Sequence, residues 1–275
     1  MAFNESRFFI NRSQITGRSQ ITGSSQITGA ANSEVCISGE DARHIAVVLR
    51  LKPGDHITAC DGEGTDYVCE LLSAGPGEAR ARIIKERPSE GEPACKITLV
   101  QSLPKSDKFG GVVQRCVEAG VRRIVPVVSE HTQFAERARG KAAERLLERW
   151  RRISLEAAKQ SGRGIVPEVR EIAGFTEVVN ECSLYSAQSP KSRLAFVPYE
   201  YEKSQKLKAL LAQFKTSSRG DAEFFVFIGP EGGFSEAEIK YCAGRGVAPV
   251  TLGPRIYRTE TAGLAVLCQI LYEFD

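Results

Sequence analysis

The chain has 275 residues, of which 42% are hydrophobic and 26% are charged, and this composition excludes a disordered or fibrous protein. Its length predicts two domains. The net charge of +3 and the pI near 8.4 are compatible with a nucleic-acid partner without indicating one, so a surface that binds nucleic acid has to come from local clusters of Lys and Arg.

The eight cysteines and three histidines are not spaced as metal ligands. There is no Cys-x-x-Cys pair, and no histidine lies at ligand spacing from a cysteine, so we expect no metal site. Most cysteines lie in apolar runs, where a reduced thiol packs as a small hydrophobe. No apolar run is long enough to span a membrane, and the start of the chain lacks a signal-peptide pattern. We therefore expect a cytoplasmic protein with no membrane partner.

Residues 1–88 are predicted to form a small β-barrel domain. A helix interrupts it, opened by Ser38 with Asp41 three residues later as an approximate capping box. Within residues 13–29 the sequence SQITG occurs three times at a six-residue period, which is too short and polar to bury a core. We interpret it as an inserted loop or irregular extended segment. The predicted strands cover residues 7–10, 34–37, 56–60, 67–72 and 79–85.

Residues 89–275 are predicted to form the second domain, after a polar connection bounded by Pro88 and Pro93. Continuous apolar strands that alternate with helices predict a mostly parallel α/β sheet covered on both faces, and the pattern alone favours a doubly wound fold. The expected strands are residues 97–101, 124–128, 193–197, 224–228 and 250–252. The expected helices are residues 108–119, 139–159, 203–214 and 236–244, and a last helix from about Glu260.

The glycine-rich turn at residues 229–233 follows a predicted strand, and ligands of open α/β sheets bind at this end of the strands. The turn lacks the known phosphate-binding spacings, and Glu231 would repel a phosphate, so a cationic or neutral ligand is favoured. A tight turn without a ligand is the alternative. The helix that follows carries a capping box formed by Ser235 and Glu238.

A second turn that carries candidate binding residues covers residues 252–262, LGPRIYRTETA. It combines a Gly-Pro pair and two arginines with Thr259, which we interpret as a helix cap, and Glu260, which the helix dipole would stabilise. Arginines in a buried turn pair with carboxylates, or they bind RNA phosphate or a developing anion.

These two turns, FIGPEGGFS at 227–235 and LGPRIYRTETA at 252–262, resemble those of the RsmE-type 16S ribosomal RNA (uracil-N3)-methyltransferases of the SPOUT superfamily. The resemblance implies an N-terminal PUA-like β-barrel that binds RNA, and a parallel-sheet SPOUT domain with a deep trefoil knot, which is too rare to predict from patterns. The SQITG repeat and Tyr257, where leucine is common, depart from the family. Similar segments lie at residues 7–10, 44–50, 53–55, 105–108, 118–121, 157–163 and 166–169.

The resemblance also implies S-adenosyl-L-methionine as cofactor, bound in the knot by loops after residues 196 and 228 and by residues 252–262. Arg258 would stabilise a uracil anion, Glu260 or a water would accept the N3 proton, and Gln160 and Arg163 would support them. The implied cofactor-binding residues are Val197, Pro198, Ile228, Gly229, Glu231, Gly232, Leu252, Gly253, Ile256, Tyr257, Arg258, Thr261 and Ala262.

The implied partner is 16S rRNA, within the small ribosomal subunit. A homodimer is expected because the last helix is apolar around its circumference and has to be covered, and because the resemblance implies dimers with shared active sites. Two alternatives stay open: a non-enzymatic RNA-binding or ribosome-assembly protein, and a knotted methyltransferase acting on a ribose 2'-oxygen or on tRNA. The expected RNA-binding residues are Arg7, Arg12 and Arg50 of the first domain, each of which could equally be a solvated surface arginine, and Arg151 and Arg152 of the basic helix.

Overall fold

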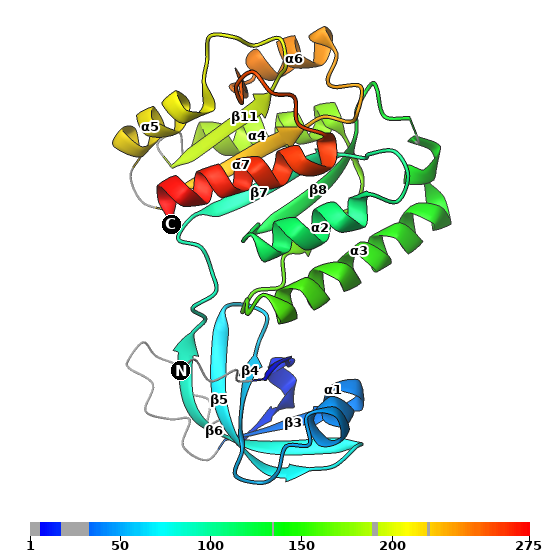
Figure 1. Cartoon of the computed structure of the whole chain (residues 1–275), viewed down its shortest axis with the longest axis vertical. Helices are drawn as coiled ribbons and strands as arrows, with labels where there is room; N and C mark the ends of the chain where they lie inside the picture. Colours follow the sequence, from blue (N-terminus) through cyan, green and yellow to red (C-terminus); the bar gives the residue numbers. More distant parts are fainter. Residues whose placement is uncertain (1–5, 18–32, 134, 189–191, 219–220) are drawn as a thin grey trace. The chain divides into compact units, whose positions relative to one another are not determined.

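The computed structural model describes residues 6–17, 33–133, 135–188, 192–218 and 221–275. The chain forms two compact units (Figure 1). The first contains Met1–Glu92 and Lys159–Val166, and the second contains Pro93–Ala158 and Pro167–Asp275. The first unit therefore includes a segment from the middle of the chain that the sequence analysis placed in the second domain.

The first unit is a six-stranded sheet in the order β1-β4-β5-β6-β3-β2, antiparallel except for the pair β1 and β4. Phe8 of β1 and Ile37 of β3 lie near opposite edges of the sheet but share one core with Ile45, so the sheet curls around that core. This agrees with the predicted barrel. The elements are β1 Arg7–Phe9, η1 Arg12–Gln14, β2 Ile15–Thr16, β3 Glu34–Ser38, α1 Gly39–Arg43, η2 His44–Val48, β4 His56–Cys60, β5 Thr65–Ala74 and β6 Glu78–Pro88.

Two details of the first unit differ from the expectations. Ser38 is the N-cap of α1, but its side chain makes no capping hydrogen bond, so the predicted capping box is not formed. The first SQITG copy is not an irregular loop, because it completes η1 and provides β2, which pairs with β3. The other two copies fall within residues 18–32, which lie outside the described residues.

The second unit contains a parallel seven-stranded sheet in the order β10-β8-β7-β12-β11-β13, with β9 paired to β8. The expected alternation of strands and helices is confirmed. The elements are β7 Lys96–Ser102, α2 Phe109–Glu118, β8 Arg123–Val128, η3 Ala135–Ala138, α3 Gly140–Gln160, β9 Glu168–Val169, β10 Ala173–Gly174, α4 Phe175–Gln188, β11 Arg193–Pro198, α5 Leu207–Ser217, β12 Glu223–Ile228, α6 Glu236–Ala243, β13 Ala248–Val250 and α7 Thr259–Phe274. The last residues of α3 belong to the first unit.

Both faces of this sheet are covered by helices (Figure 1). Successive residues of a strand point to opposite faces, and Phe227 packs against Phe175 of α4, whereas Phe224 packs against Phe274 of α7. The helices α2 and α5 contact α7, and α6 contacts α4. Because helices cover both faces of the sheet, the strand ends are the favoured positions for a ligand. None of the helices in the described part of the chain is long and apolar enough to cross a membrane.

Candidate functional site

A cavity of about 890 Å³ lies at the carboxyl ends of β11, β12 and β13. Its walls are the three loops that follow these strands, together with Lys108 and residues of α5 and α7 such as Leu207 and Gln269, and all of these residues belong to the second unit. The volume lies in the range of roughly 300 to 1,000 Å³ that is usual for small-molecule sites. The structure thus has a cavity at the two turns, residues 229–233 and 252–262, where the sequence predicted a binding site.

Thr259 ties two walls of the cavity together. Its hydroxyl donates a hydrogen bond to the Gly229 carbonyl (2.5 Å) and accepts one from the Gln101 side-chain amide (2.9 Å). Thr259 and Gln101 are both buried. The expectation that Thr259 caps the last helix is wrong, because Arg258 is the N-cap and the hydroxyl is committed to the neighbouring loop.

Two carboxylates hold the glycine-rich loop to neighbouring segments of the chain. The Glu231 carboxylate accepts the Lys105 backbone N–H through both oxygens (2.9 and 3.1 Å). The capping box of Ser235 and Glu238 is confirmed, and Glu238 also accepts the Glu130 N–H (2.8 Å). These contacts fix the path of the loop backbone, as a site that binds through backbone groups requires.

Glu260 lines the cavity and has a carboxylate oxygen without a hydrogen-bond partner among the described residues. Its Oε1 accepts a hydrogen bond from Lys108 Nζ (3.0 Å), while its Oε2 is buried and has no hydrogen-bond partner among the described residues. The backbone N–H of Glu260 and the Lys108 ammonium hold the pKa of this carboxyl below its ordinary value, and Arg258 adds to the effect. The Glu260 carboxylate is therefore charged, and its Oε2 is a buried acceptor without a partner among the described residues.

Most of the residues expected to bind the cofactor line the cavity. Three do not: Val197 is fully buried in the core, a side chain at Gly232 would meet His131 (3.1 Å), and Thr261 is exposed outside the lining. The two arginines of the second turn, Arg255 and Arg258, are exposed and not buried as expected. The residues that do line it are Pro198, Ile228, Gly229, Glu231, Leu252, Gly253, Ile256, Tyr257, Arg258 and Ala262.

Sequence reasoning missed several lining residues, among them Lys108, Tyr199, Glu202 and Phe234. Lys108 follows the end of β7, the strand next to β12, so the rule that ligands bind at strand ends could have found it. Glu202 is ionised, since hydrogen bonds from the Ser204 hydroxyl and from backbone N–H groups lower its pKa to about 2.

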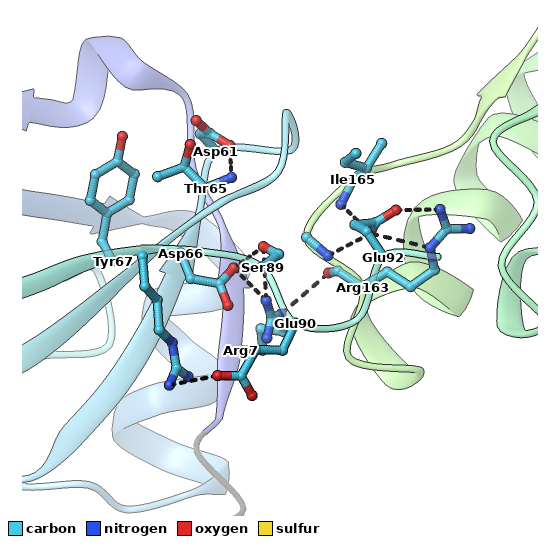
Figure 2. Close-up of polar contacts among 12 residues, drawn as sticks. Arg7, Asp61, Thr65, Asp66, Tyr67, Ser89, Glu90, Glu92, Arg163 and Ile165 are labelled. Carbon is cyan, nitrogen blue, oxygen red and sulfur yellow. Dashed lines mark hydrogen bonds and ion pairs between the residues drawn. The ribbon is translucent and has the colours of Figure 1, made fainter. Parts of the chain in front are cut away.

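Gln160 and Arg163 belong to the first unit and do not line the cavity. The Arg163 side chain is 2% exposed and forms an ion pair with Glu92 through Nη2 (2.6 Å). The same carboxylate accepts the N–H groups of Gly164 and Ile165 (both 3.0 Å), as Figure 2 shows. A buried guanidinium needs such a partner, so Arg163 is bound within its own unit, and its expected supporting role in catalysis stays a prediction.

The arginines expected to contact RNA differ in how far they are committed to protein partners. Arg7 forms an ion pair with the buried Asp66 and donates to the Arg163 carbonyl (3.2 Å), so Figure 2 shows it inside a protein network. Arg12 pairs with Asp61 (2.8 Å) and Glu63 (3.0 Å).

The other three arginines present their charge to solvent. Arg50 and Arg152 are exposed, and Arg151 is exposed although its Nε donates to the Val169 carbonyl (3.1 Å). We therefore keep Arg50, Arg151 and Arg152 as the stronger candidates for phosphate contacts.

Comparisons with known proteins match two parts of the chain to domains of RNA methyltransferases. A model of the RNA methyltransferase domain matches residues 91–271, and a model of the RNA methyltransferase PUA domain matches residues 37–84. The chain is 32% identical to the ribosomal RNA small subunit methyltransferase E of Bacillus subtilis over 87% of its own length and 90% of that protein. It is 31% identical to the protein of the same name from Synechocystis over 86% and 72% of the two chains.

The crystal structure of a ribosomal RNA small subunit methyltransferase E from Neisseria gonorrhoeae, bound to S-adenosyl methionine, matches with a TM-score of 0.74. The two chains are 29% identical, and the match covers 98% of this chain and 97% of that one. The family that the two turns indicated is thereby confirmed. The chain belongs to the ribosomal RNA small subunit methyltransferase E family, with a PUA domain followed by an RNA methyltransferase domain.

Proposed function

We propose that this enzyme transfers a methyl group from S-adenosyl-L-methionine to N3 of one uridine of 16S rRNA in the small ribosomal subunit. The observation that carries the proposal is the cavity at the strand ends, which is walled by the loops after three strands and lined by Glu260. Family membership supports the reaction class. We also propose that the three loops are knotted as in the SPOUT fold, a prediction that the Thr259 bridge between two of them supports.

The residues around the cavity fit the cofactor. Glycines and prolines on two walls, such as Gly229 and Pro254, leave backbone groups accessible to an adenine edge. Carboxylates of Glu202 and Glu260 suit an amino group or a sulfonium, and lysines including Lys203 suit a carboxylate,. When bound, the cofactor supplies an electrophilic methyl group.

The chain's own residues then have to hold the uracil and stabilise it as it loses the N3 proton. Arg258 lines the cavity with an exposed guanidinium, and this position supports its proposed role of stabilising a developing uracil anion. Glu260 has a lowered pKa and is a weak base, so we assign it a hydrogen bond from N3–H or an amino group, and the proton leaves to water. Sequence reasoning had left this choice open.

The proposal is tested by calorimetry with S-adenosyl-L-methionine, followed by transfer of a labelled methyl group to naked 16S rRNA and to purified small subunits. We expect binding and label in 16S rRNA. A protein that binds rRNA but not the cofactor would instead be a ribosome-assembly factor, and label in tRNA alone would assign a different substrate. The substrate and the eight free cysteines both support a cytoplasmic enzyme.

RNA binding is predicted to weaken with salt, and the basic helix α3 is predicted to contribute. Each lost phosphate contact should reduce the slope of log K against log salt by roughly 0.7 to 0.9. Replacing both Arg151 and Arg152 by alanine should therefore flatten the slope by up to two contacts, as filter binding across a salt series would show. Replacing Arg12, which is paired with Asp61 and Glu63, is the matched control and should change the slope less. Equal slopes for wild type and the double variant would place α3 away from the RNA.

A homodimer is predicted from the outer face of α7. Val266 and Ile270 are fully buried in the chain, but Cys268 is exposed and Tyr272 is 89% exposed, and an apolar face of this kind is seldom left open in a monomer. Sedimentation should give about twice the chain mass of 30.1 kDa. Tyr272→Glu should shift the equilibrium to monomer and lower activity with it. A fully active monomer would contradict both the dimer and a site shared between subunits.

A further inference from the structure

A second cavity of about 270 Å³ lies in the methyltransferase unit, between α3 and the loop that follows β7. Its volume is just below the range of roughly 300 to 1,000 Å³ for whole ligands, so it suits a single flat ring better than a cofactor. Its walls are formed by Leu103, Pro104, Ser106, Asp107, Phe109, Leu146, Arg149 and Trp150. Most of these are apolar or aromatic.

Trp150 provides an unused hydrogen-bond donor in this wall. Its ring packs on Phe109, with centroids 4.2 Å apart, and the side chain is 3% exposed. The indole N–H is buried and has no hydrogen-bond partner among the described residues. An unpaired buried N–H is costly and rare, so a ligand that brings an acceptor to it would be favoured.

Arg149 and Asp107 form an exposed ion pair at the rim of the cavity. Arg149 Nη1 lies 2.5 Å from Asp107 Oδ2, and both side chains are more than half exposed. Exposed ion pairs of this kind add little stability. The Arg149 guanidinium could therefore leave Asp107 and stack on a planar ring, as arginines do on splayed RNA bases.

One loop separates this cavity from the proposed methyl-transfer site. Ser106, Asp107 and Phe109 line the second cavity, whereas Lys108 lines the first and contacts Glu260. Lys105 is held by Glu231 of the first site. Ser106 adopts a left-handed conformation (φ 60°), which is uncommon for a residue other than glycine. The two cavities are thus neighbours across residues 105–109.

We propose that the second cavity binds a base of the RNA next to the methylated uridine, with its edge accepting a hydrogen bond from Trp150 and its face covered by Arg149. The inference rests on the proposed function and adds a subsite for a flanking nucleotide. A neighbour held there would help to draw the target uridine out of its stack, since an unstacked base is needed for reaction at N3. It would also give the enzyme a preference for the nucleotide beside its target.

Three variants separate this role from simple packing. Trp150→Phe removes the N–H but keeps the aromatic ring, Leu146→Phe fills the cavity, and Arg149→Ala removes the cover, with Arg145→Ala as a control one helical turn away. Loss of a stacked base weakens binding by about 5- to 150-fold. We expect Leu146→Phe and Arg149→Ala to raise KM for 16S rRNA within this range. Trp150→Phe, which removes only a hydrogen bond, should raise KM by about 2- to 12-fold. The kcat and the affinity for S-adenosyl-L-methionine should be unchanged in all three variants. Arg145→Ala should have a smaller effect.

Fluorescence gives an independent readout, because Trp150 is the single tryptophan of the chain. Adding 16S rRNA should quench its emission, and the quenching should be lost in Leu146→Phe. If the wild type methylates rRNA but Trp150→Phe and Leu146→Phe change thermal stability alone, the subsite is refuted and the proposed function stands. If the wild type neither binds nor methylates rRNA, the proposed function fails, and RNA as the occupant fails with it.

Discussion

Replacing Arg258 by alanine should lower kcat for methyl transfer by roughly 10²- to 10³-fold, the usual cost of removing one group that stabilises a developing anion. The affinity for S-adenosyl-L-methionine should change little, because the guanidinium is exposed at the cavity wall and its structural contribution is the backbone N-cap of α7. Single-turnover rates with saturating cofactor and rRNA would measure the effect.

The matched control is Arg255→Ala, since Arg255 is also exposed and lines the same cavity. We expect a loss of less than about tenfold, because only the group at the reacting base acts on the transition state. Raising the pH should partly restore the Arg258→Ala rate by favouring the uracil anion. Equal losses in the two variants, with no recovery at high pH, would mean that the turn contributes general positive charge and that Arg258 has no specific role.

Replacing Thr259 by valine should destabilise the protein and the cofactor site together. The change keeps the shape but leaves the Gly229 carbonyl and the Gln101 amide without their shared partner, at a cost of about 1 to 3 kcal/mol for an unsatisfied buried group. Urea unfolding would measure this loss of stability. Because two walls of the cavity lose their connection, calorimetry should show Kd for S-adenosyl-L-methionine raised by tenfold or more.

Thr259→Ser keeps the hydroxyl and serves as the control, with both quantities expected near those of the wild type. A Thr259→Val protein that binds the cofactor normally despite its lower stability would separate the bridge from the site. In that case the two loops would be positioned by other contacts.

The strands and helices that carry continuous apolar or helical periodicity were predictable from the sequence. The buried apolar run at Phe224–Ile228 and the one-sided apolar pattern of α3 can be recognised from neighbouring residues, because burial imposes a regular spacing of apolar side chains. The helix α4 was missed although Phe175, Val178, Val179 and Cys182 follow helical spacing and are buried. Two-residue strands such as β10 cannot be predicted, because pairing with β8 defines them and their own sequence carries no period.

The sequence predicted which loops form the site, but it predicted the contacts of individual side chains less well. The turns at residues 229–233 and 252–262 both form walls of the cavity, because the carboxyl ends of parallel strands meet at one edge of the sheet. The partner of the Thr259 hydroxyl, Gly229, and the partner of the Arg163 guanidinium, Glu92, were not predicted, since both are distant in sequence. Local patterns contain no information about such pairings.

The central claim is that the cavity at the ends of β11, β12 and β13 methylates uracil at N3 in 16S rRNA. Mass spectrometry of nucleosides tests it most directly, after wild-type enzyme and the Arg258→Ala variant have each been incubated with the cofactor and small subunits that lack the modification. The account predicts one additional 3-methyluridine per 16S rRNA with the wild type, with the methyl group on the base fragment, and almost none with the variant in the same time. A methyl group on the ribose fragment, or on no nucleoside of 16S rRNA, would contradict it.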